Sequence, residues 1–346
     1  MIRKNLFVHN WTIRAFKLGM AFSVLLSVAS CGGNDDEDLV GNWARLGDFN
    51  GNPRAGAISG TIGNEAFIGT GYDGENYLVD FWKYDVSKDN WSQMAKFEGV
   101  GRRSAVAFTA SGKLYVGTGY DGTSRLKDFW AYNPTDNTWT RIEDFGGTAR
   151  RGAVAFSINN IGYVATGDDT NYLKDMWAYN PATDEWTEST SVGGSKRRDA
   201  VVFVINNKAY IAGGVNNGLY VSDFHSFDPE TEIWSKLRNI SDNTAEAFDD
   251  DYNMERTFAV AFAVNGKGYI ATGGKGSPGT TTWEYDPLTD LWQEKTSLEG
   301  AARQEAVAFV LNDVAFVGLG RNSSYYFEDI WRFEPNAEQN DYDNDN

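Results

Sequence analysis

One unit of about 48 residues recurs six times along this chain of 346 residues. Three independent markers share the period: an Arg followed three residues later by Ala, a Gly that closes an apolar run, and a Trp late in the unit. The arginines are Arg54, Arg102, Arg150, Arg197, Arg256 and Arg303. A fixed period of roughly 20 to 50 residues is the signature of repeat architectures, in which each copy buries its apolar face against the next. The chain is therefore predicted to fold as six copies of one small unit.

Within a unit the pattern is that of short β-strands. In the second unit, apolar or alternating segments are separated by turn residues such as Ser111-Gly112 and Asn133-Pro134. They predict strands at residues 105–108, 114–119, 128–132 and 138–141. No segment shows a helical period of useful length. The sequence therefore predicts an all-β protein built of four-stranded units.

A four-stranded unit of this length, repeated six times, is typical of a β-propeller blade. The Gly pair after the second strand, the aromatic residue of the third strand and the Trp of the fourth resemble the kelch motif. The resemblance covers residues 41–335 and is to bacterial kelch-repeat propellers of the galactose-oxidase-like superfamily. It implies an all-β, six-bladed kelch-type β-propeller, a fold that hosts enzymes and pure binders alike.

The two ends of the repeat region complement each other. The sixth unit ends after its third strand, at Pro335, and no Trp follows. Its missing fourth strand is found at the other end, around Trp43. We expect this N-terminal strand to complete the last blade and close the ring, which removes the open edge that a broken ring would expose. Residues 336–346 are acidic and polar and are predicted to be a disordered tail.

Residues 1–30 have the pattern of an export signal. Four basic residues and no acid accompany a short apolar stretch, which is shorter than the roughly 20 residues that a membrane span needs. The stretch ends in Val28-Ala-Ser-Cys31, which resembles the bacterial lipobox and implies cleavage before Cys31 and lipidation of that residue. The alternative is an ordinary signal peptide with an incidental free Cys.

Residues 31–40 are polar and acidic and are predicted to be a solvated tether after the lipidated Cys31. Such an acidic run resembles the surface-export signal of Bacteroidetes-type lipoproteins. The resemblance implies an outer-membrane lipoprotein that faces the cell exterior. We expect a monomeric propeller that contacts the membrane through its lipid anchor alone.

Composition excludes several function classes. The net charge of −17 argues against a nucleic-acid binder, because phosphate neutralisation needs a basic face. The galactose oxidase family needs two His, two Tyr and a cross-linked Cys around copper, whereas His225 is the one His after the signal and stands where other units have a Trp. The Ser-x-Asp-x-Gly-x-x-Trp box of sialidases is absent. We therefore predict no cofactor, no metal site and no nucleophilic triad, and we interpret His225 as a packing residue.

The candidate ligand-binding residues come from two sets of connections that alternating strand directions bring to one face. These are the loops between successive units and the loops between the second and third strands of a unit. The candidates are Arg54, Arg102, Arg150, Arg197, Arg256, Arg303, Tyr72, Asp73, Tyr120, Asp121, Asp168 and Asp169. A ring of guanidinium groups could bind a carboxylate-bearing ligand. The alternative is that each Arg pairs with an acid of its own unit just before the third strand, as architecture.

The fifth unit departs from the others. Thr282 is taken to stand where the other units have that acid, so Arg256 is predicted to be the unpaired arginine. The one long insertion lies between Trp234 and Arg256 on the same face, and its acidic residues are also weak candidates for binding Ca²⁺.

These observations predict a surface lipoprotein that acts as a binding module for a glycan or for an envelope protein. One alternative is a sialate-type sugar mutarotase or epimerase with an Arg-lined mouth, since that chemistry needs only carboxylates and an Arg to hold the substrate acid. The other alternative is a purely structural partner in an envelope complex.

Overall fold

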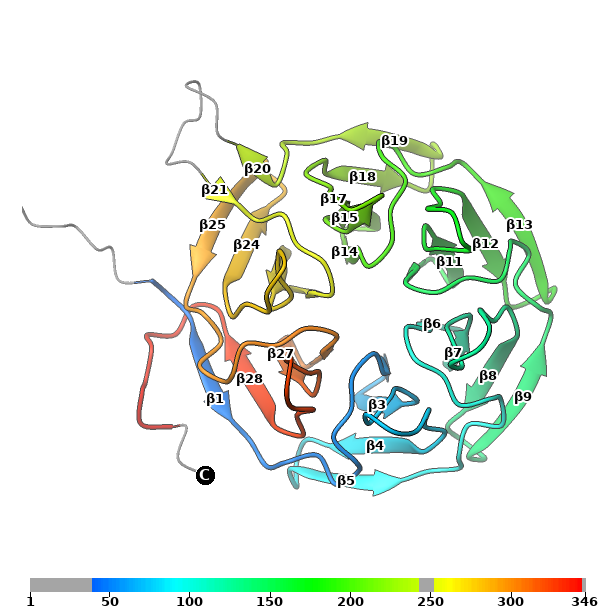
Figure 1. Ribbon diagram of the computed structural model, residues 1–346, viewed down its shortest axis with the longest axis horizontal. Helices are drawn as coiled ribbons and strands as arrows, with labels where there is room; N and C mark the ends of the chain where they lie inside the picture. The colour runs from blue at the N-terminus through cyan, green and yellow to red at the C-terminus, as the bar shows by residue number, and fades with distance from the viewer. Residues whose placement is uncertain (1–38, 243–251, 344–346) are drawn as a thin grey trace, which may run out of the picture. The chain divides into compact units, whose positions relative to one another are not determined.

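The computed structural model describes residues 39–242 and 252–343, and within them it contains only strands, turns and loops. These residues form six four-stranded antiparallel sheets arranged around an axis (Figure 1). The prediction of an all-β, six-bladed propeller is confirmed. None of the described residues forms a helix able to cross a membrane. The predicted signal, the lipidation site at Cys31 and most of the tether lie outside the described residues, as do residues 243–251 of the insertion and residues 344–346 of the tail.

Blade one consists of β2 (Ile58–Ile62), β3 (Glu65–Gly69), β4 (Phe81–Asp85) and β5 (Asn90–Gln93). Blade two consists of β6 (Val106–Ala110), β7 (Lys113–Gly117), β8 (Phe129–Asn133) and β9 (Thr138–Ile142). Blade three consists of β10 (Val154–Ile158), β11 (Ile161–Ala165), β12 (Met176–Asn180) and β13 (Glu185–Ser189). Blade four consists of β14 (Val201–Ile205), β15 (Lys208–Ala212), β18 (His225–Asp228) and β19 (Ile233–Lys236). Blade five consists of β22 (Val260–Val264), β23 (Lys267–Ala271), β24 (Thr282–Asp286) and β25 (Leu291–Lys295). Blade six consists of β26 (Val307–Leu311), β27 (Val314–Gly318), β28 (Ile330–Glu334) and β1 (Asn42–Arg45).

Two small hairpins stand outside the blades. The first joins β16 (Val215–Asn216) to β17 (Leu219–Tyr220) in the connection from β15 to β18. The second joins β20 (Ser241–Asp242) to β21 (Tyr252–Asn253) in the connection from blade four to blade five. The second hairpin is the base of the long insertion that the repeat spacing revealed.

The N-terminal strand closes the ring as predicted. Strand β1 pairs antiparallel with β28, with Trp43 opposite Phe333. The Trp43 side chain is fully buried, stacks on Phe333 at 4.4 Å between ring centroids, and donates its indole N–H to the carbonyl of Thr296 at 3.0 Å. The last blade therefore gains its outer strand from a segment almost 300 residues away in sequence.

Part of the tail that was predicted to be disordered lies against this closing strand. The amide N–H of Asn340 donates to the Asn42 side-chain oxygen at 2.8 Å, and the Asn42 side chain donates to Asp343 at 2.8 Å. The backbone of Gly41 donates to the carbonyl of Ala337. Three hydrogen bonds thus connect Ala337, Asn340 and Asp343 to residues 41 and 42.

The core lies between blades, where aromatic residues of neighbouring sheets interlock. Phe81 of blade one packs edge-on against Tyr132 and Trp139 of blade two, at 4.7 Å and 5.0 Å between centroids. His225 is 6% exposed, in keeping with the packing role inferred from its position. Apolar side-chain contacts thus pack neighbouring blades against each other, whereas the pairing of the blade strands stays within each sheet.

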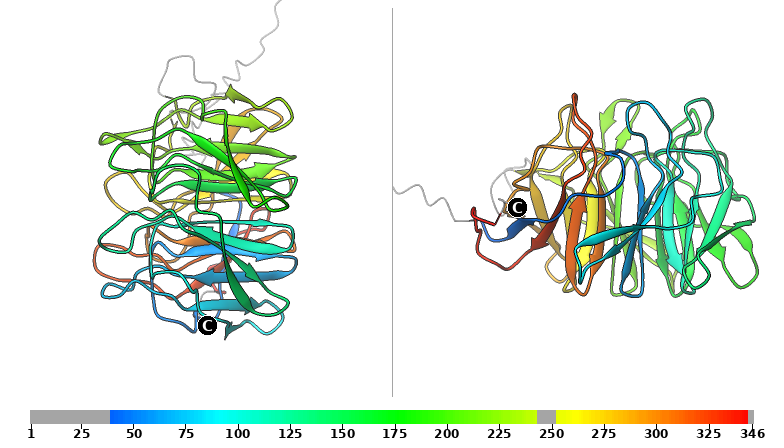
Figure 2. Two further views of the ribbon diagram at one scale, coloured as in Figure 1. Left: turned by 90° about the vertical axis from the view of Figure 1, so that its right-hand side faces the viewer. Right: turned by 90° about the horizontal axis from the view of Figure 1, so that it is seen from below.

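The first strand of each blade lies innermost, and these six strands contact one another around the axis. They enclose a cavity of about 240 Å³ that is lined mainly by alanines, among them Ala57, Ala105, Ala153, Ala200 and Ala259. Small side chains are needed here because six strands pack side by side around the axis and leave little room between them. Figure 2 views the ring of blades from the side, with the connecting loops gathered on its two faces.

Candidate functional site

The Arg that opens each repeat is buried and, in five blades, paired with a carboxylate of the same blade. In blade two, Arg102 is fully buried and forms two parallel hydrogen bonds to Asp128 at 2.8 Å and 2.7 Å. Its other bonds go to the carbonyls of Val100 at 2.9 Å and Thr118 at 3.0 Å. Four of its five N–H donors are thereby used. Burial disfavours the ionised form of Asp128, but the hydrogen bonds and charge of Arg102 outweigh that penalty and hold the pKa of Asp128 below its ordinary value.

Four further blades repeat the arrangement with fully buried arginines. The pairs are Arg54–Asp80, Arg150–Asp175, Arg197–Asp223 and Arg303–Asp329. In the blades of Arg54, Arg102, Arg150 and Arg303, the carboxylate also accepts the indole N–H of the Trp two residues later. Because these five guanidinium groups are inaccessible and bound, we remove them from the candidate ligand site. In these five blades the structure shows the alternative in which each Arg pairs with an acid of its own blade.

Arg256 in blade five has no carboxylate partner among the described residues. The prediction that Thr282 takes the place of the paired aspartates is wrong by one residue. Those aspartates stand two residues before the third-strand Trp, which in blade five is Trp283, so the corresponding residue is Thr281. Arg256 Nη2 donates to the Thr281 hydroxyl at 2.9 Å, and Nη1 donates to the Thr281 carbonyl at 3.2 Å. Burial lowers the pKa of Arg256 to about 10. The residue is 8% exposed, whereas its five counterparts are at 0%.

Most of the predicted loop acids stabilise their own loops. Asp73 accepts backbone N–H groups of Glu75 and Asn76 at 2.9 Å and 2.7 Å, and Asp121 accepts those of its own loop in the same way. Asp169 accepts the N–H of Asn171 at 3.0 Å. These bonds are those of Asx turns, which hold a tight loop in shape. Asp73 also lines a surface pocket of about 340 Å³ together with neighbouring loop residues.

The two predicted tyrosines belong to a row of aromatic rings on the same face. Tyr72 packs against Tyr77 at 4.8 Å and against Tyr326 at 6.1 Å, and Tyr77 packs against Tyr120 at 6.2 Å between centroids. All four side chains are half-buried. They form a continuous partly exposed aromatic surface, which we call the tyrosine row, over blades six, one and two.

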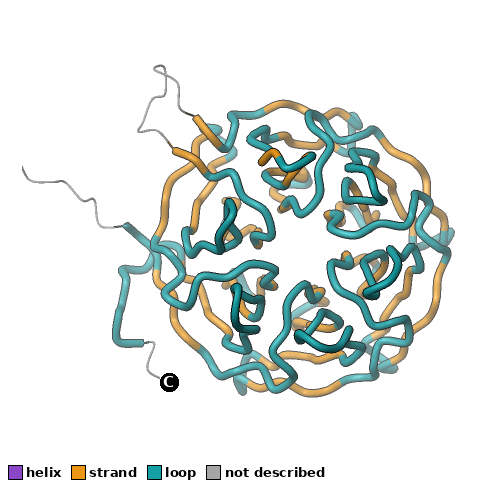
Figure 3. The backbone as a smooth tube through the Cα atoms, in the orientation of Figure 1, coloured by secondary structure: helices purple, strands orange, loops and turns teal. Residues whose placement is uncertain are grey.

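A closed ring of backbone hydrogen bonds surrounds the axis on this face, where loops of all six blades converge (Figure 3). The residue two positions after each repeat Arg donates its N–H to the carbonyl of its counterpart in the adjacent blade, at 2.8 Å to 3.2 Å. The six residues are Gly56, Ser104, Gly152, Asp199, Phe258 and Glu305. All six have positive φ, between 52° and 62°. We call this ring and the side chains around it the axial mouth.

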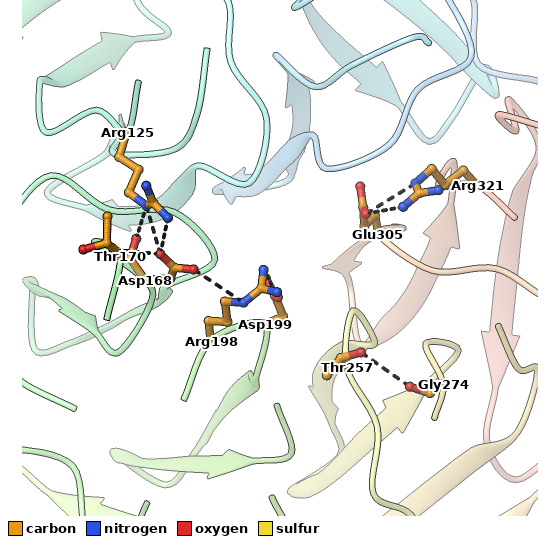
Figure 4. A network of polar contacts seen from close by, with 9 residues as sticks. All are labelled: Arg125, Asp168, Thr170, Arg198, Asp199, Thr257, Gly274, Glu305 and Arg321. Carbon is orange, nitrogen blue, oxygen red and sulfur yellow. Dashed lines mark hydrogen bonds and ion pairs between the residues drawn. The ribbon is translucent and has the colours of Figure 1, made fainter. Parts of the chain in front are cut away.

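Two carboxyl groups stand in the ring itself. Glu305 pairs with Arg321 through two hydrogen bonds of 3.3 Å and 2.9 Å, and its second oxygen is buried without a partner. Asp199 lies 2.9 Å from Arg198 Nη1 in an ion pair, and Arg198 in turn lies 3.7 Å from Asp168 (Figure 4). Burial, reinforced by repulsion from Glu305, raises the pKa of Asp199 to about 7, against attraction by Arg198. The mouth thus holds a carboxyl group that changes charge near neutral pH.

Asp168 is the one predicted acid that joins the axial mouth. Its carboxylate accepts two hydrogen bonds from Arg125, the longer at 2.9 Å, and its side chain is 11% exposed. It links the loop of blade two to that of blade three (Figure 4). Of the predicted loop acids, Asp168 is therefore the one that belongs to the axial mouth.

Two guanidinium groups at the mouth have no acidic partner. Arg103 and Arg151 each follow a repeat Arg directly, and among the described residues neither side chain forms an ion pair or a hydrogen bond. Arg103 lies over the ring of Tyr72 at 5.6 Å, and Arg151 lies over the ring of Tyr120 at 5.0 Å. Arg151 Nε is buried without an acceptor. Unlike the five paired arginines of the repeat, these two form no ion pair with the described residues, although Asp199 acts electrostatically on Arg151.

The residues predicted from the sequence include neither these second arginines nor Asp199 and Glu305. Position within the repeat was the signal that could have found them. Residues one and two positions after each buried Arg vary from unit to unit, whereas the Arg and Ala around them do not. Within residues 39–242 and 252–343, no group of three His, Cys, Asp or Glu is placed to hold a metal ion.

The fold and the repeat geometry define a six-bladed β-propeller, and comparison with known proteins gives its class. The KLHDC2/KLHL20/DRC7 kelch-repeats domain matches residues 48–214, and the kelch motif matches residues 196–241. The chain is a kelch-repeat β-propeller. A solved structure described as "Structure of YjhT" is similar with a TM-score of 0.67 and 19% identity, over 82% of this chain and 96% of that one, a likeness of fold alone. No curated protein matches the chain.

Proposed function

We propose that this propeller is a binding module that holds an acidic saccharide at the axial mouth. The observation that carries the proposal is the pair Arg103 and Arg151, whose guanidinium groups form no ion pair and no hydrogen bond among the described residues, although Asp199 acts electrostatically on Arg151. A buried donor without an acceptor, such as Arg151 Nε, calls for a partner, and a planar guanidinium matches a carboxylate bidentately. The ligand therefore carries a carboxylate.

The tyrosine row supports a sugar as the bearer of that carboxylate. Tyr72 and Tyr120 already hold the two arginines by cation–π contact, so the charged groups and the aromatic faces lie together. Aromatic side chains with one polar end suit ligands that are apolar on one face and hydroxylated at the edge. A carboxylate-bearing pyranose has both properties. A protein partner with an acidic segment is the outcome that would follow if saccharides fail.

Binding to immobilised saccharides tests the proposal. The chain starting at residue 31, with Cys31→Ser to keep it free of lipid, would be screened against uronate- and sialate-type saccharides and their neutral analogues. Acidic saccharides are expected to bind. Arg103→Ala or Arg151→Ala should weaken binding about 10- to 100-fold, since a charged hydrogen bond is lost.

The matched control is Arg141→Ala. Arg141 lies on outer strand β9 with its side chain 58% exposed and pairs with Asp144, so its loss should leave binding unchanged. Equal binding of neutral analogues, or equal weakening by the control, would remove the carboxylate from the proposal. No saccharide binding by folded protein would move the proposal to an acidic protein partner of the envelope.

We further propose that the module sits on the outer membrane as a surface lipoprotein. The support is the lipobox-like Val28-Ala-Ser-Cys31 and the acidic residues after it. Two or three acyl chains on one Cys are enough for stable anchoring. Radiolabelled palmitate should be incorporated by the wild-type chain and not by Cys31→Ser, and protease added to intact cells should cleave the propeller. Labelling of both chains would contradict the assignment of Cys31.

A second candidate function, mutarotation or epimerisation of the same acidic sugar, is favoured by Asp199. A carboxyl group with a pKa of about 7 is suited to proton transfer at neutral pH. The assay is the rate of anomer exchange of the bound sugar by NMR. Asp199→Asn should abolish exchange while binding persists. Exchange at the uncatalysed rate with wild-type protein would leave binding as the function.

A further inference from the structure

Blade five lacks one member of a charge pair that all other blades possess. In four of those blades a single carboxylate oxygen accepts both Arg Nη2 and the indole N–H of the Trp, as Asp128 does from Arg102 and Trp130 at 2.7 Å and 2.8 Å. The place between these two donors is therefore built for a negative atom. It is also reached by solvent, because the Asp128 side chain is 20% exposed.

In blade five the donors remain but the acceptor is gone. Arg256 occupies the repeat position, and Trp283 holds the same register on the third strand, opposite Ile270 as Trp130 is opposite Val116. Thr281 accepts from Arg256 at 2.9 Å, but among the described residues no group accepts the indole N–H of Trp283. The Thr281 hydroxyl, having accepted one bond, still has a proton to donate. Arg256 Nη2, the Trp283 indole N–H and the Thr281 hydroxyl are thus three donors at the position where the other blades have an aspartate.

The loop that covers this place in other blades is also changed. A Cβ added to Gly300 would lie 2.9 Å from Arg303 Nη2 and 2.8 Å from Trp331 Nε1, so only Gly fits against the two donors there. The same position in blade five is Asn253, which is exposed. Because Asn has a Cβ, Asn253 cannot approach the donors of blade five as closely as Gly300 approaches those of blade six, and the ring of the neighbouring Tyr252 packs against Trp283 at 6.0 Å between centroids.

The charge of Arg256 makes a neutral occupant insufficient. The guanidinium is buried, forms no ion pair with the described residues, and keeps its charge at neutral pH. Glu294 acts on it electrostatically without forming an ion pair with it. A buried charge that lacks a partner is strongly destabilising unless something compensates it. From the missing carboxylate and the surviving donors, we propose that Arg256, Thr281 and Trp283 bind a small monovalent anion, chloride or a small carboxylate, in place of the absent aspartate.

This site is independent of the proposed saccharide site at the axial mouth, and thermal unfolding tests it. The purified protein would be compared in chloride, formate and gluconate at equal ionic strength, gluconate being too large to enter. Chloride or formate should raise the melting temperature by on the order of 2 °C or more, as expected for an ion that binds the folded state alone. A larger shift in formate would assign the site to carboxylates, and a larger shift in chloride would assign it to halides.

Two substitutions make the test specific. Thr281→Asp restores the pair of the other blades, so it should raise the melting temperature in gluconate and abolish the anion effect. Asp128→Thr should create a second anion-dependent blade, with part of its lost stability recovered in formate. Bromide soaked into crystals should give an anomalous peak beside Trp283 that is absent from Thr281→Asp.

An unchanged melting temperature across the three salts, or an anion effect that persists in Thr281→Asp, would overturn the proposal. The saccharide screen reports on Arg103 and Arg151 alone, so failure of one proposal leaves the other standing.

Discussion

Replacement of Trp43 by Ala tests how the ring is held shut. Strand β1 is bound to β28 without a short covalent link, and Trp43 is its one large buried side chain, at 0% exposure. Removing a buried Trp destabilises a core by about 3–5 kcal/mol. The Thr296 carbonyl also loses its hydrogen-bond donor, which adds roughly 1 kcal/mol or more. The sum, about 5 kcal/mol, corresponds to a melting temperature lower by roughly 10 °C for a domain of this size.

Trp91→Ala is the matched control. Trp91 has the same place in blade one, is 4% exposed and packs against Tyr84 at 4.8 Å between ring centroids in a tilted arrangement. Its indole N–H has no partner among the described residues, and its strand follows β4 through a tight turn. Its loss should lower stability by about 3–4 kcal/mol. Hydrogen exchange distinguishes the two, because only Trp43→Ala should expose the amides of β1. Equal losses of stability, with β1 still protected in both variants, would refute the view that Trp43 holds the closure.

Three further outcomes are expected. Gly152→Ala should destabilise the fold more than Gly56→Ala in thermal unfolding. Both residues have φ near 60°, but a Cβ at Gly152 would overlap the Asp199 carboxylate, whereas one at Gly56 meets nothing nearer than 3.3 Å. Equal effects would contradict this reasoning. Burial raises the pKa of Asp199 to about 7 from 3.8, so the folded state keeps a proton that the unfolded chain releases. The free energy of unfolding should therefore fall as pH rises between about 4 and 7. Asp199→Asn should flatten this part of the pH profile, and an unchanged profile would count against the assignment. Asp128→Asn should lower the free energy of unfolding, measured by denaturant titration, by about 3 kcal/mol, because it leaves a buried guanidinium without its charge partner. Asp144→Asn, in an exposed pair, should change it by about 0.5 kcal/mol or less.

The fold was predictable because its determinants recur in sequence at a constant spacing. Each blade repeats the same apolar strands, so the period alone indicated six sheets, and the displaced Trp43 indicated how the last one is completed. The arginine pairs were foreseen as one of two alternatives. Choosing between them required burial, since the spacing of Arg102 and Asp128 is the same whether the guanidinium faces the core or a ligand. Thr282 was assigned to the aspartate position of blade five because the units were aligned one residue out of register, and Trp283 shows that Thr281 holds this position.

The axial mouth could not be predicted in the same way. Its six ring positions are occupied by residues as different as Gly152, Phe258 and Glu305, so no residue type marks them. What they share is a left-handed backbone conformation, which composition does not reveal for residues other than Gly. The raised pKa of Asp199 likewise depends on burial and on Glu305, a residue more than one hundred positions away in sequence.

The backbone ring has a consequence for how this protein could acquire new specificities. Every link uses only main-chain N–H and carbonyl groups, so the aperture does not depend on which side chains the six positions carry. Ser104 and Phe258 hold the same link with unrelated side chains. Substitution at positions that already carry a side chain, such as Ser104 and Phe258, can therefore change the chemical surface of the mouth while the ring keeps its links, whereas a Cβ at Gly152 would overlap the Asp199 carboxylate. The ring of backbone bonds is thus common to all six blades, whereas the side chains around it differ from blade to blade.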